Sequence, residues 1–139
     1  MNIPGLRSPY ETVGGLVHFG RMLDKIRLHA AGKLPADYIP NLGTGFDGRC
    51  CKFLHIDYPA LVARVKQGGT DEEILSSCRH PTSEEIEVWN GFMKKSGWHD
   101  AGKARLVQRL QEAGLTHRTD IQTFFDFIDA DEGRPLTSF

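Results

Sequence analysis

The chain has 139 residues, the size of one domain, and a chain of this length can bury enough surface to fold without disulfide bonds or a metal. Hydrophobic residues make up 40% of it and charged residues 25%, which excludes a mainly disordered protein. Lys and Arg number 17 against 18 Asp and Glu, so no overall positive field attracts nucleic acid or an anionic membrane. We expect one soluble domain over residues 1–139 that binds neither nucleic acid nor membranes.

The N-terminal residues and the cysteines indicate a cytoplasmic protein. Residues 1–8 have no apolar run and contain Pro4 and Gly5, unlike a secretory signal peptide. No segment is long and apolar enough to cross a bilayer. The chain has three cysteines, and Cys50 and Cys51 are adjacent, so they do not form a disulfide framework. A reducing compartment fits this cysteine content.

The first helical signal is short. Ser8 can cap a helix, Pro9 suits its first position, and Glu11 can bond back to the cap. Gly14 and Gly15 follow, and together they cost about 2 kcal/mol relative to alanine in a helix interior. We therefore predict a first turn that ends early, and a break before the next helix.

The strongest helical pattern runs from Leu16 to Ala31. At about 100° per residue its apolar side chains share one side, which predicts a core-facing helix. These residues are Leu16, Phe19, Met22, Leu23, Ile26 and Ala30. The opposite side carries four basic residues, here called the cationic ridge: His18, Arg21, Lys25 and His29. Asp24 lies three residues from both Arg21 and Arg27 and is expected to pair with one of them.

The rest of the chain predicts one loop and several short helices. Residues 33–48 are rich in Gly and Pro and carry no hydrophobic period, which predicts a long loop. Capping residues and helical spacing predict the later helices to start at residue 46, Asp57, Thr70 with Glu73, Thr82 with Glu85, Lys103 and Asp120. No segment alternates apolar and polar residues for long enough to predict a strand. The expected fold is all-α, a single compact domain of six or seven short helices with one long Gly/Pro-rich loop.

Several segments resemble an uncharacterised bacterial family. They are residues 6–9 (LRSP), 14–18 (GGLVH), 21–25 (RMLDK) and 85–90 (EIEVWN). The family is the domain of unknown function numbered fifty sixty-nine, and the resemblance spans nearly the whole chain. It implies a bacterial, cytoplasmic, stand-alone domain, and it lends no activity, cofactor or catalytic residue to these positions.

The cationic ridge is the candidate ligand site. Arginine offers a planar pair of donors and lysine a point charge, so the ridge can hold a carboxylate or a phosphate. A solvated helix face is the alternative, because most surface helices carry charges opposite their apolar stripe. Val17 and Leu28 flank the ridge, which favours a second covered face. Covered charges without partners are costly, so a covered ridge needs a bound anion or an acidic partner.

Two further patterns are weaker. Residues 43–48 (GTGFDG) have the spacing of a dinucleotide-binding loop, but no strand precedes them. An ordinary turn and an anion site at the following helix N-terminus remain the alternatives.

Four residues can ligate zinc, namely Cys51, His55, Cys78 and His80. Their spacing is not that of a known zinc finger, and Cys50 and Cys78 fit apolar helix faces, so we predict no metal and no cofactor. A cysteine–histidine nucleophile pair has no third group in the sequence to orient it.

Acidic and aromatic residues gather in the C-terminal third. The acidic residues are Asp126, Asp129, Asp131 and Glu132, which lack the ligand pattern of a calcium loop. We expect them to pair with Arg134 or with Arg21 and Lys25 of the ridge. Helical spacing predicts that Trp89, Phe92, Phe124 and Phe125 are core residues. Phe127 lies off this stripe, and its exposure would favour a homodimer or partner surface.

Three functions are consistent with these patterns. The leading prediction is a non-catalytic, cytoplasmic helical module that binds a small anionic ligand or a protein partner, with His18, Arg21, Asp24 and Lys25 as its ligand-binding residues. The second is an enzyme in which His18 acts as acid or base and Arg21 orients an anionic substrate, with Asp24 fixing one of them. The third is a structural homodimer without a ligand. A deep pocket containing His18 and Arg21 would favour the ligand or the enzyme.

Overall fold

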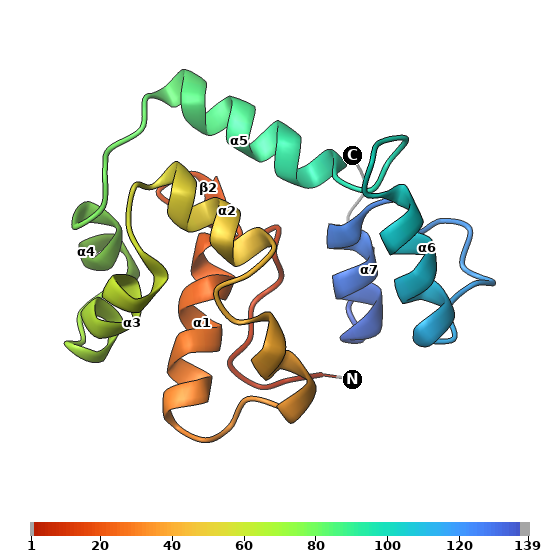
Figure 1. The fold of residues 1–139 in the computed structure, drawn as a ribbon, viewed down its shortest axis with the longest axis horizontal. Coiled ribbons are helices and arrows are strands. Elements are labelled where there is room, and N and C mark those ends of the chain that lie inside the picture. Colours follow the sequence, from red (N-terminus) through yellow and green to blue (C-terminus); the bar gives the residue numbers. More distant parts are fainter. Residues whose placement is uncertain (1, 137–139) are drawn as a thin grey trace.

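A computed structural model describes residues 2–136, and Figure 1 shows their arrangement. The predicted domain also included residue 1 and residues 137–139, which lie outside the described part. The helices within it are α1 (Phe19–Ala30), the 3-10 helix η1 (Ala36–Asn41), α2 (Phe46–Phe53), α3 (Tyr58–Lys66), α4 (Asp71–Ser76), α5 (Ser83–Lys95), α6 (Lys103–Glu112) and α7 (Phe124–Asp131). Two short strands, β1 (Thr12–Val13) and β2 (Leu16–Val17), precede them. The fold is therefore mostly helical, and the prediction of an all-α fold is corrected by this hairpin.

The hairpin forms where the sequence indicated only a break. Thr12 pairs with Val17 and Val13 with Leu16 in antiparallel register. Gly14 and Gly15 make the turn between them with φ of 57° and 81°, a left-handed conformation that glycine adopts without strain. Strands of two residues are too short to show alternation of apolar and polar residues, so the sequence contains no strand signal.

The first long helix starts later than predicted. Leu16 and Val17 belong to β2, and the helix begins only at Phe19. His18 connects the two with a φ of 70°, and its carbonyl oxygen accepts a hydrogen bond from the Met22 N–H at 2.9 Å. The side chain of His18 therefore leaves the backbone at a bend rather than along a regular helix.

The other helix predictions are mostly confirmed. Both capping boxes are present, Thr70 with Glu73 and Thr82 with Glu85. The predicted loop contains η1, so residues 33–48 are not wholly irregular. The last helix begins at Phe124 and not at Asp120, because Thr123 supplies the cap by accepting a hydrogen bond from the Asp126 N–H.

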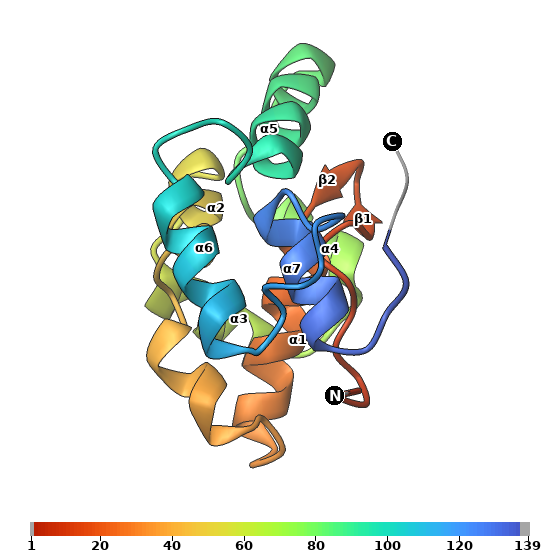
Figure 2. The same ribbon diagram turned by 90° about the vertical axis from the view of Figure 1, so that its right-hand side faces the viewer.

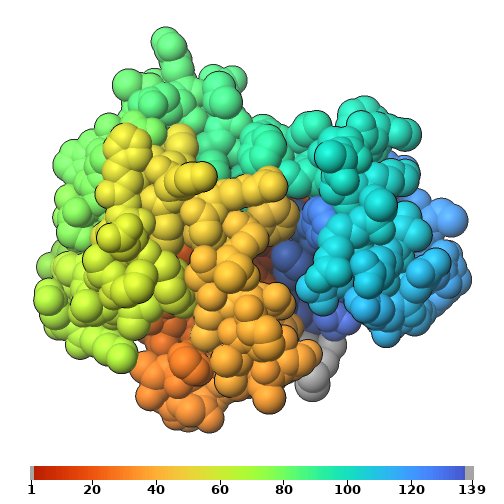
Figure 3. Space-filling view, in the orientation of Figure 1, coloured from red at the N-terminus to blue at the C-terminus, as the bar shows by residue number. Residues whose placement is uncertain are grey.

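Helix α1 lies near the centre of the molecule. In Figure 1, α3 and α4 lie on one side of it and α6 and α7 on the other, and Figure 2 shows α7 crossing in front of it. The core includes the apolar side of α1 and residues from the surrounding helices, among them Phe19, Met22, Leu23, Leu54, Leu61, Ile74, Met93 and Phe125. In Figure 3, α2 and the loop before it cover the front of α1. Over residues 2–136, no helix has both the length and the apolar character that crossing a membrane requires.

Candidate functional site

The cationic ridge is covered over most of its length, as the flanking apolar residues predicted. His18 is 2% exposed, Arg21 4% and Lys25 7%. His29 is exposed, so its inclusion in the covered ridge was wrong. It lies in the last turn of α1, one residue before the helix ends at Ala30. Each of the three buried basic side chains pairs with a carboxylate.

Asp47, in the first turn of α2, pairs with two of them. One carboxylate oxygen lies 2.8 Å from His18 Nε2 and the other lies 2.8 Å from Lys25 Nζ. The Gly43 N–H also donates to this carboxylate at 3.2 Å. The glycine-rich loop thus does bring a backbone N–H to an anion, but the anion is the chain's own Asp47.

The charge states of this trio follow from its burial. Burial alone would raise the pKa of Asp47, but the hydrogen bond from His18 and the charge of Lys25 lower it to about 2. Burial lowers the pKa of His18 and outweighs the opposite effect of Asp47. His18 is therefore neutral beside an ionised Asp47, with the proton on Nε2. Its Nδ1 is a bare acceptor with no hydrogen-bond partner among the described residues.

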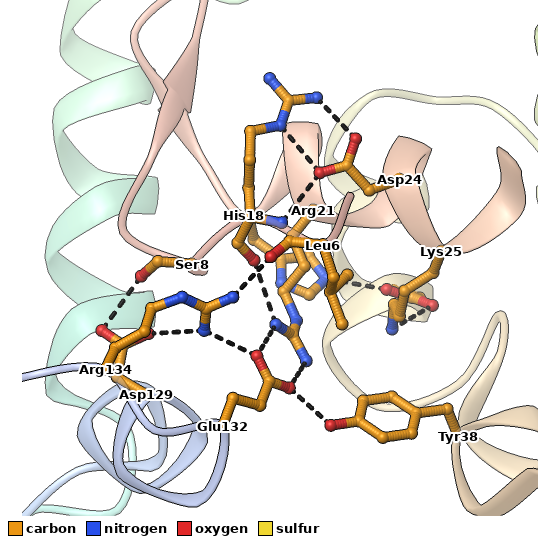
Figure 4. A network of polar contacts seen from close by, with 12 residues as sticks. Leu6, Ser8, His18, Arg21, Asp24, Lys25, Tyr38, Asp129, Glu132 and Arg134 are labelled. Atoms are coloured by element: carbon orange, nitrogen blue, oxygen red, sulfur yellow. Dashed lines mark hydrogen bonds and ion pairs between the residues drawn. The ribbon is translucent and has the colours of Figure 1, made fainter. Parts of the chain in front are cut away.

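Glu132 neutralises Arg21 from the C-terminal end of α7. The two side chains form a bidentate pair with N–O distances of 2.8 and 2.7 Å (Figure 4). The Tyr38 hydroxyl donates to the same carboxylate at 2.7 Å, and Arg134 donates to it at 2.6 Å. The pairing of the C-terminal acidic cluster with Arg21 and Arg134 is confirmed, whereas Lys25 pairs with Asp47 instead. We call His18, Arg21, Lys25, Asp47 and Glu132 the buried ion network.

Other members of the acidic cluster tie the N-terminal segment to α7. Ser8 Oγ donates to Asp129 at 3.0 Å, and the Tyr10 hydroxyl donates to Asp126 at 2.8 Å. Arg134 also donates to Asp129 at 3.1 Å. Ser8 Oγ also accepts a hydrogen bond from the Tyr10 N–H at 3.2 Å, so Ser8 caps a turn at residues 9–10 as predicted, but this turn does not continue into a helix.

Asp24 lies outside the buried ion network. Its carboxylate accepts from Arg7 Nε at 2.8 Å and from the Arg7 backbone N–H at 3.0 Å. Of the two arginines predicted as local partners, Arg27 lies 3.7 Å from the Asp24 carboxylate, whereas within residues 2–136 Asp24 forms no ion pair with Arg21. Arg7 and Arg27 also pair with Asp71 of α4, at 2.8 and 2.7 Å. Asp24 therefore joins α1 to the N-terminal segment and α4.

The four zinc-capable residues do not form one site. Cys51 and Cys78 are buried in the core, whereas His55 and His80 are exposed. Over residues 2–136, no group of three or more His, Cys, Asp or Glu side chains is placed to hold a metal ion. Burial raises the pKa of Cys51 to about 11, which keeps the thiol protonated at neutral pH.

The exposed apolar residues are not those that the sequence indicated. Phe127 is half-buried. Val88 and Phe92 of α5 are 73% and 43% exposed, although helical spacing had placed Phe92 in the core. About 100° around the same helix from these two residues, Trp89 and Met93 are buried.

Comparison with known families identifies the family to which the chain belongs. The family model described as Domain of unknown function (DUF5069) matches residues 3–134. The chain belongs to this family. A comparison with curated proteins gives no match. The family carries no assigned activity, so function has to be argued from the DUF5069 domain's own residues.

The buried ion network can do two things chemically. It joins α1 to α2, to η1 and to α7 through charged hydrogen bonds, which are about twice as strong as neutral ones. It also leaves His18 Nδ1 as a base held in place by a carboxylate on the other ring nitrogen, the arrangement of many catalytic histidines. The His18 ring is enclosed by Phe46 and Phe125, with centroid distances of 5.9 and 6.5 Å.

Proposed function

We propose that this DUF5069 chain is a non-catalytic helical module that acts in the bacterial cytoplasm by binding a protein partner. The observation that carries the proposal is the outward side of α5, where Val88 and Phe92 remain exposed at 73% and 43%. Neighbouring apolar side chains at a surface favour a protein interface. The three cysteines Cys50, Cys51 and Cys78 are free, which suits a reducing compartment.

The buried ion network gives little support to the small anionic ligand of the sequence prediction. The donors of Arg21 already hold Glu132, and both side chains are at most 5% exposed. A phosphate or carboxylate ligand at Arg21 would have to displace Glu132. The displaced carboxylate would then be buried without its partner, at a cost of several kcal/mol. Of the two ligands predicted for the module, a protein partner is therefore the better supported.

The surface beside Val88 and Phe92 has the composition of a protein interface. An open groove next to Val88 is lined by Phe53, Trp89 and Phe92, among others. Phe53 stacks on Trp89 with ring centroids 4.9 Å apart. Arg79 lies over Phe53 at 4.9 Å, and Arg49 over Phe92 at 5.3 Å. Aromatic residues and arginine are enriched at protein interfaces.

A photo-crosslinking amino acid tests this proposal in living cells. A benzophenone analogue of phenylalanine at position 92 should give one discrete adduct, whose partner mass spectrometry identifies. The same analogue at position 107 is the matched control, because Val107 lies on α6 and is 40% exposed. We expect no comparable adduct from position 107. Equal labelling from both positions, or none from position 92, would contradict a partner surface on α5.

An enzyme remains the second candidate, because His18 has the arrangement of a general base. Asp47 takes the orienting role that the sequence assigned to Asp24, and the left-handed backbone at His18 is the kind of strain found at active sites. A substrate would have to reach Nδ1, but the His18 side chain is only 2% exposed. Diethyl pyrocarbonate, which acylates neutral histidine, should therefore leave His18 unmodified in the native protein and modify His55 and His80. Rapid native modification of His18 would favour the enzyme.

A further inference from the structure

We infer that the protein partner is a second copy of this chain, packed antiparallel along α5 about a two-fold axis. This inference rests on the proposed function, since it names the partner of the α5 surface. A two-fold interface uses the same surface on both subunits, so the surface has to be complementary to itself. The residues on the outward side of α5 meet this requirement.

The outward side of α5 is defined by its position relative to the core. Trp89 and Met93 are buried. At about 100° per residue, the opposite side of the helix carries Glu84, Glu87, Val88, Gly91 and Lys95. Phe92 lies at one edge of this side. In Figure 2, the first turns of α5 extend beyond the other helices, and in Figure 3 the helix forms the upper rim of the molecule. A second helix can therefore approach without meeting the rest of the chain first.

The charges at the two ends of this side, Glu84 and Lys95, are complementary to themselves in the antiparallel direction only. Glu84 and Lys95 are equally distant from the midpoint of the outward side of α5, one toward each end of the helix. Two antiparallel helices therefore place Glu84 of one copy opposite Lys95 of the other. Two parallel helices would place like charges together. Lys95 Nζ lies 3.3 Å from Asp100 in the single chain, and exchanging such an exposed pair costs little.

Gly91 has no packing role within the single chain. A Cβ atom added at Gly91 has no heavy atom within 4 Å, and glycine destabilises a helix interior relative to alanine. In the antiparallel pair, Gly91 of one copy faces Val88 of the other, because both are equally distant from the same midpoint. The missing side chain lets the two helix backbones approach closely and makes room for the valine. The dimer thus gives this glycine a structural purpose.

Phe92 extends the apolar contact to one side of the helix pair. A two-fold axis perpendicular to the pair keeps an edge residue on the same side in both copies, so the two Phe92 rings lie near each other. The groove lined by Phe53, Val88, Trp89 and Phe92 lies along this edge. Arg79 and Glu85, which are paired at 3.0 Å, border it. The interface therefore has an apolar centre and a charged rim.

Sedimentation velocity over a concentration series tests the inference with the full chain. We expect a dimer for the wild type and at least about a tenfold weaker dimer for Val88→Asp, since the carboxylate would be buried at the centre. Val107→Asp, an exposed valine changed on α6, is the matched control and should dimerise like the wild type. Gly91→Gln should also weaken the dimer. Its melting temperature at low protein concentration should not fall, because a Cβ atom at this position has no heavy atom within 4 Å in the single chain.

Charge exchange tests the antiparallel register. Glu84→Lys should weaken the dimer several-fold, and Glu84→Lys combined with Lys95→Glu should restore it. A wild type that stays monomeric throughout, a Val88→Asp variant that dimerises like Val107→Asp, or a double charge variant that is not restored would each overturn the inference. If the wild type is monomeric and position 92 crosslinks a different protein, the inference fails and the proposed function stands. If position 92 also gives no adduct, both fail.

Discussion

The buried ion network and the outward side of α5 invert the usual distribution of polar and apolar groups. Arg21, Lys25 and their carboxylate partners are inside, each less than 10% exposed. Val88 and Phe92, both apolar, are outside. The comparison shows that the chain itself supplies the carboxylates that pair with the buried basic residues of the ridge. Under the proposal above, the exposed Val88 and Phe92 of α5 mark the binding surface.

Removal of one partner in the buried ion network should give the largest effect. Glu132→Gln keeps the size of the side chain but leaves the Arg21 guanidinium buried without a counter-charge. We expect the free energy of unfolding to fall by about 3–5 kcal/mol, measured by urea denaturation. The control is Asp120→Asn, which breaks an exposed pair with Arg118 and should leave the midpoint unchanged within error. A loss below about 1 kcal/mol for Glu132→Gln would show that the pair contributes no more than a surface pair.

The next largest effect should come from Asp47, in the dependence of the free energy of unfolding on acid pH. Its pKa is about 2 in the native state and near 3.8 when unfolded, so its contribution is full above pH 4 and is lost as the pH falls toward 2. The difference corresponds to about 2 kcal/mol. Asp47→Asn, measured by urea denaturation between pH 5 and 2, should flatten the loss of stability over this window. The same slope in both proteins would contradict the assigned role of Asp47.

His18 should add a separate dependence at higher pH. Burial lowers the pKa of His18 in the native state. Below about pH 6.5, His18 is therefore protonated in the unfolded chain but still neutral in the native chain. Stability should therefore already fall as the pH drops from about 6.5, before Asp47 begins to titrate. His18→Asn tolerates the left-handed backbone and should remove this part of the slope. An unchanged slope in that variant would contradict a neutral, buried His18.

A glycine exchange on α5 should give the smallest effect, and with the opposite sign. Gly91→Ala, measured at low protein concentration, should raise the free energy of unfolding by about 0.5–1 kcal/mol, because the new methyl group has room and the helix gains propensity. Gly14→Ala is the contrasting control. It needs a left-handed backbone and its Cβ would clash with Leu75, so it should destabilise the protein. Destabilisation by Gly91→Ala would show that the glycine is required within the single chain.

Local features of the fold were predictable from the sequence. Thr82 and Glu85 are three residues apart, so the capping box they form depends on nothing distant. The hairpin at Gly14 and Gly15 was missed, because its strands are too short to show a period and because Asn90 of α5 holds it in place.

The site was predictable only in part. The burial of Arg21 followed from the flanking apolar residues, and the acidic cluster supplied its partner, although Glu132 is 111 residues away. Asp47 was missed as the partner of Lys25, because nothing in residues 43–48 indicates that this carboxylate turns inward. Phe92 was misplaced because apolar residues surround much of α5, and periodicity does not tell which side of such a helix faces the core.

The central claim proposed for this DUF5069 chain is that two copies bind one another through α5 and not through the cationic ridge. Backbone amide NMR spectra of the wild type, recorded on serial dilution, test it most directly. The account predicts that the amide shifts that change with concentration belong to residues 84–95 and to Phe53 and Arg79 beside the groove, while those of α1 and α7 stay constant. Shifts independent of concentration, or changes centred on His18 and Arg21, would contradict it.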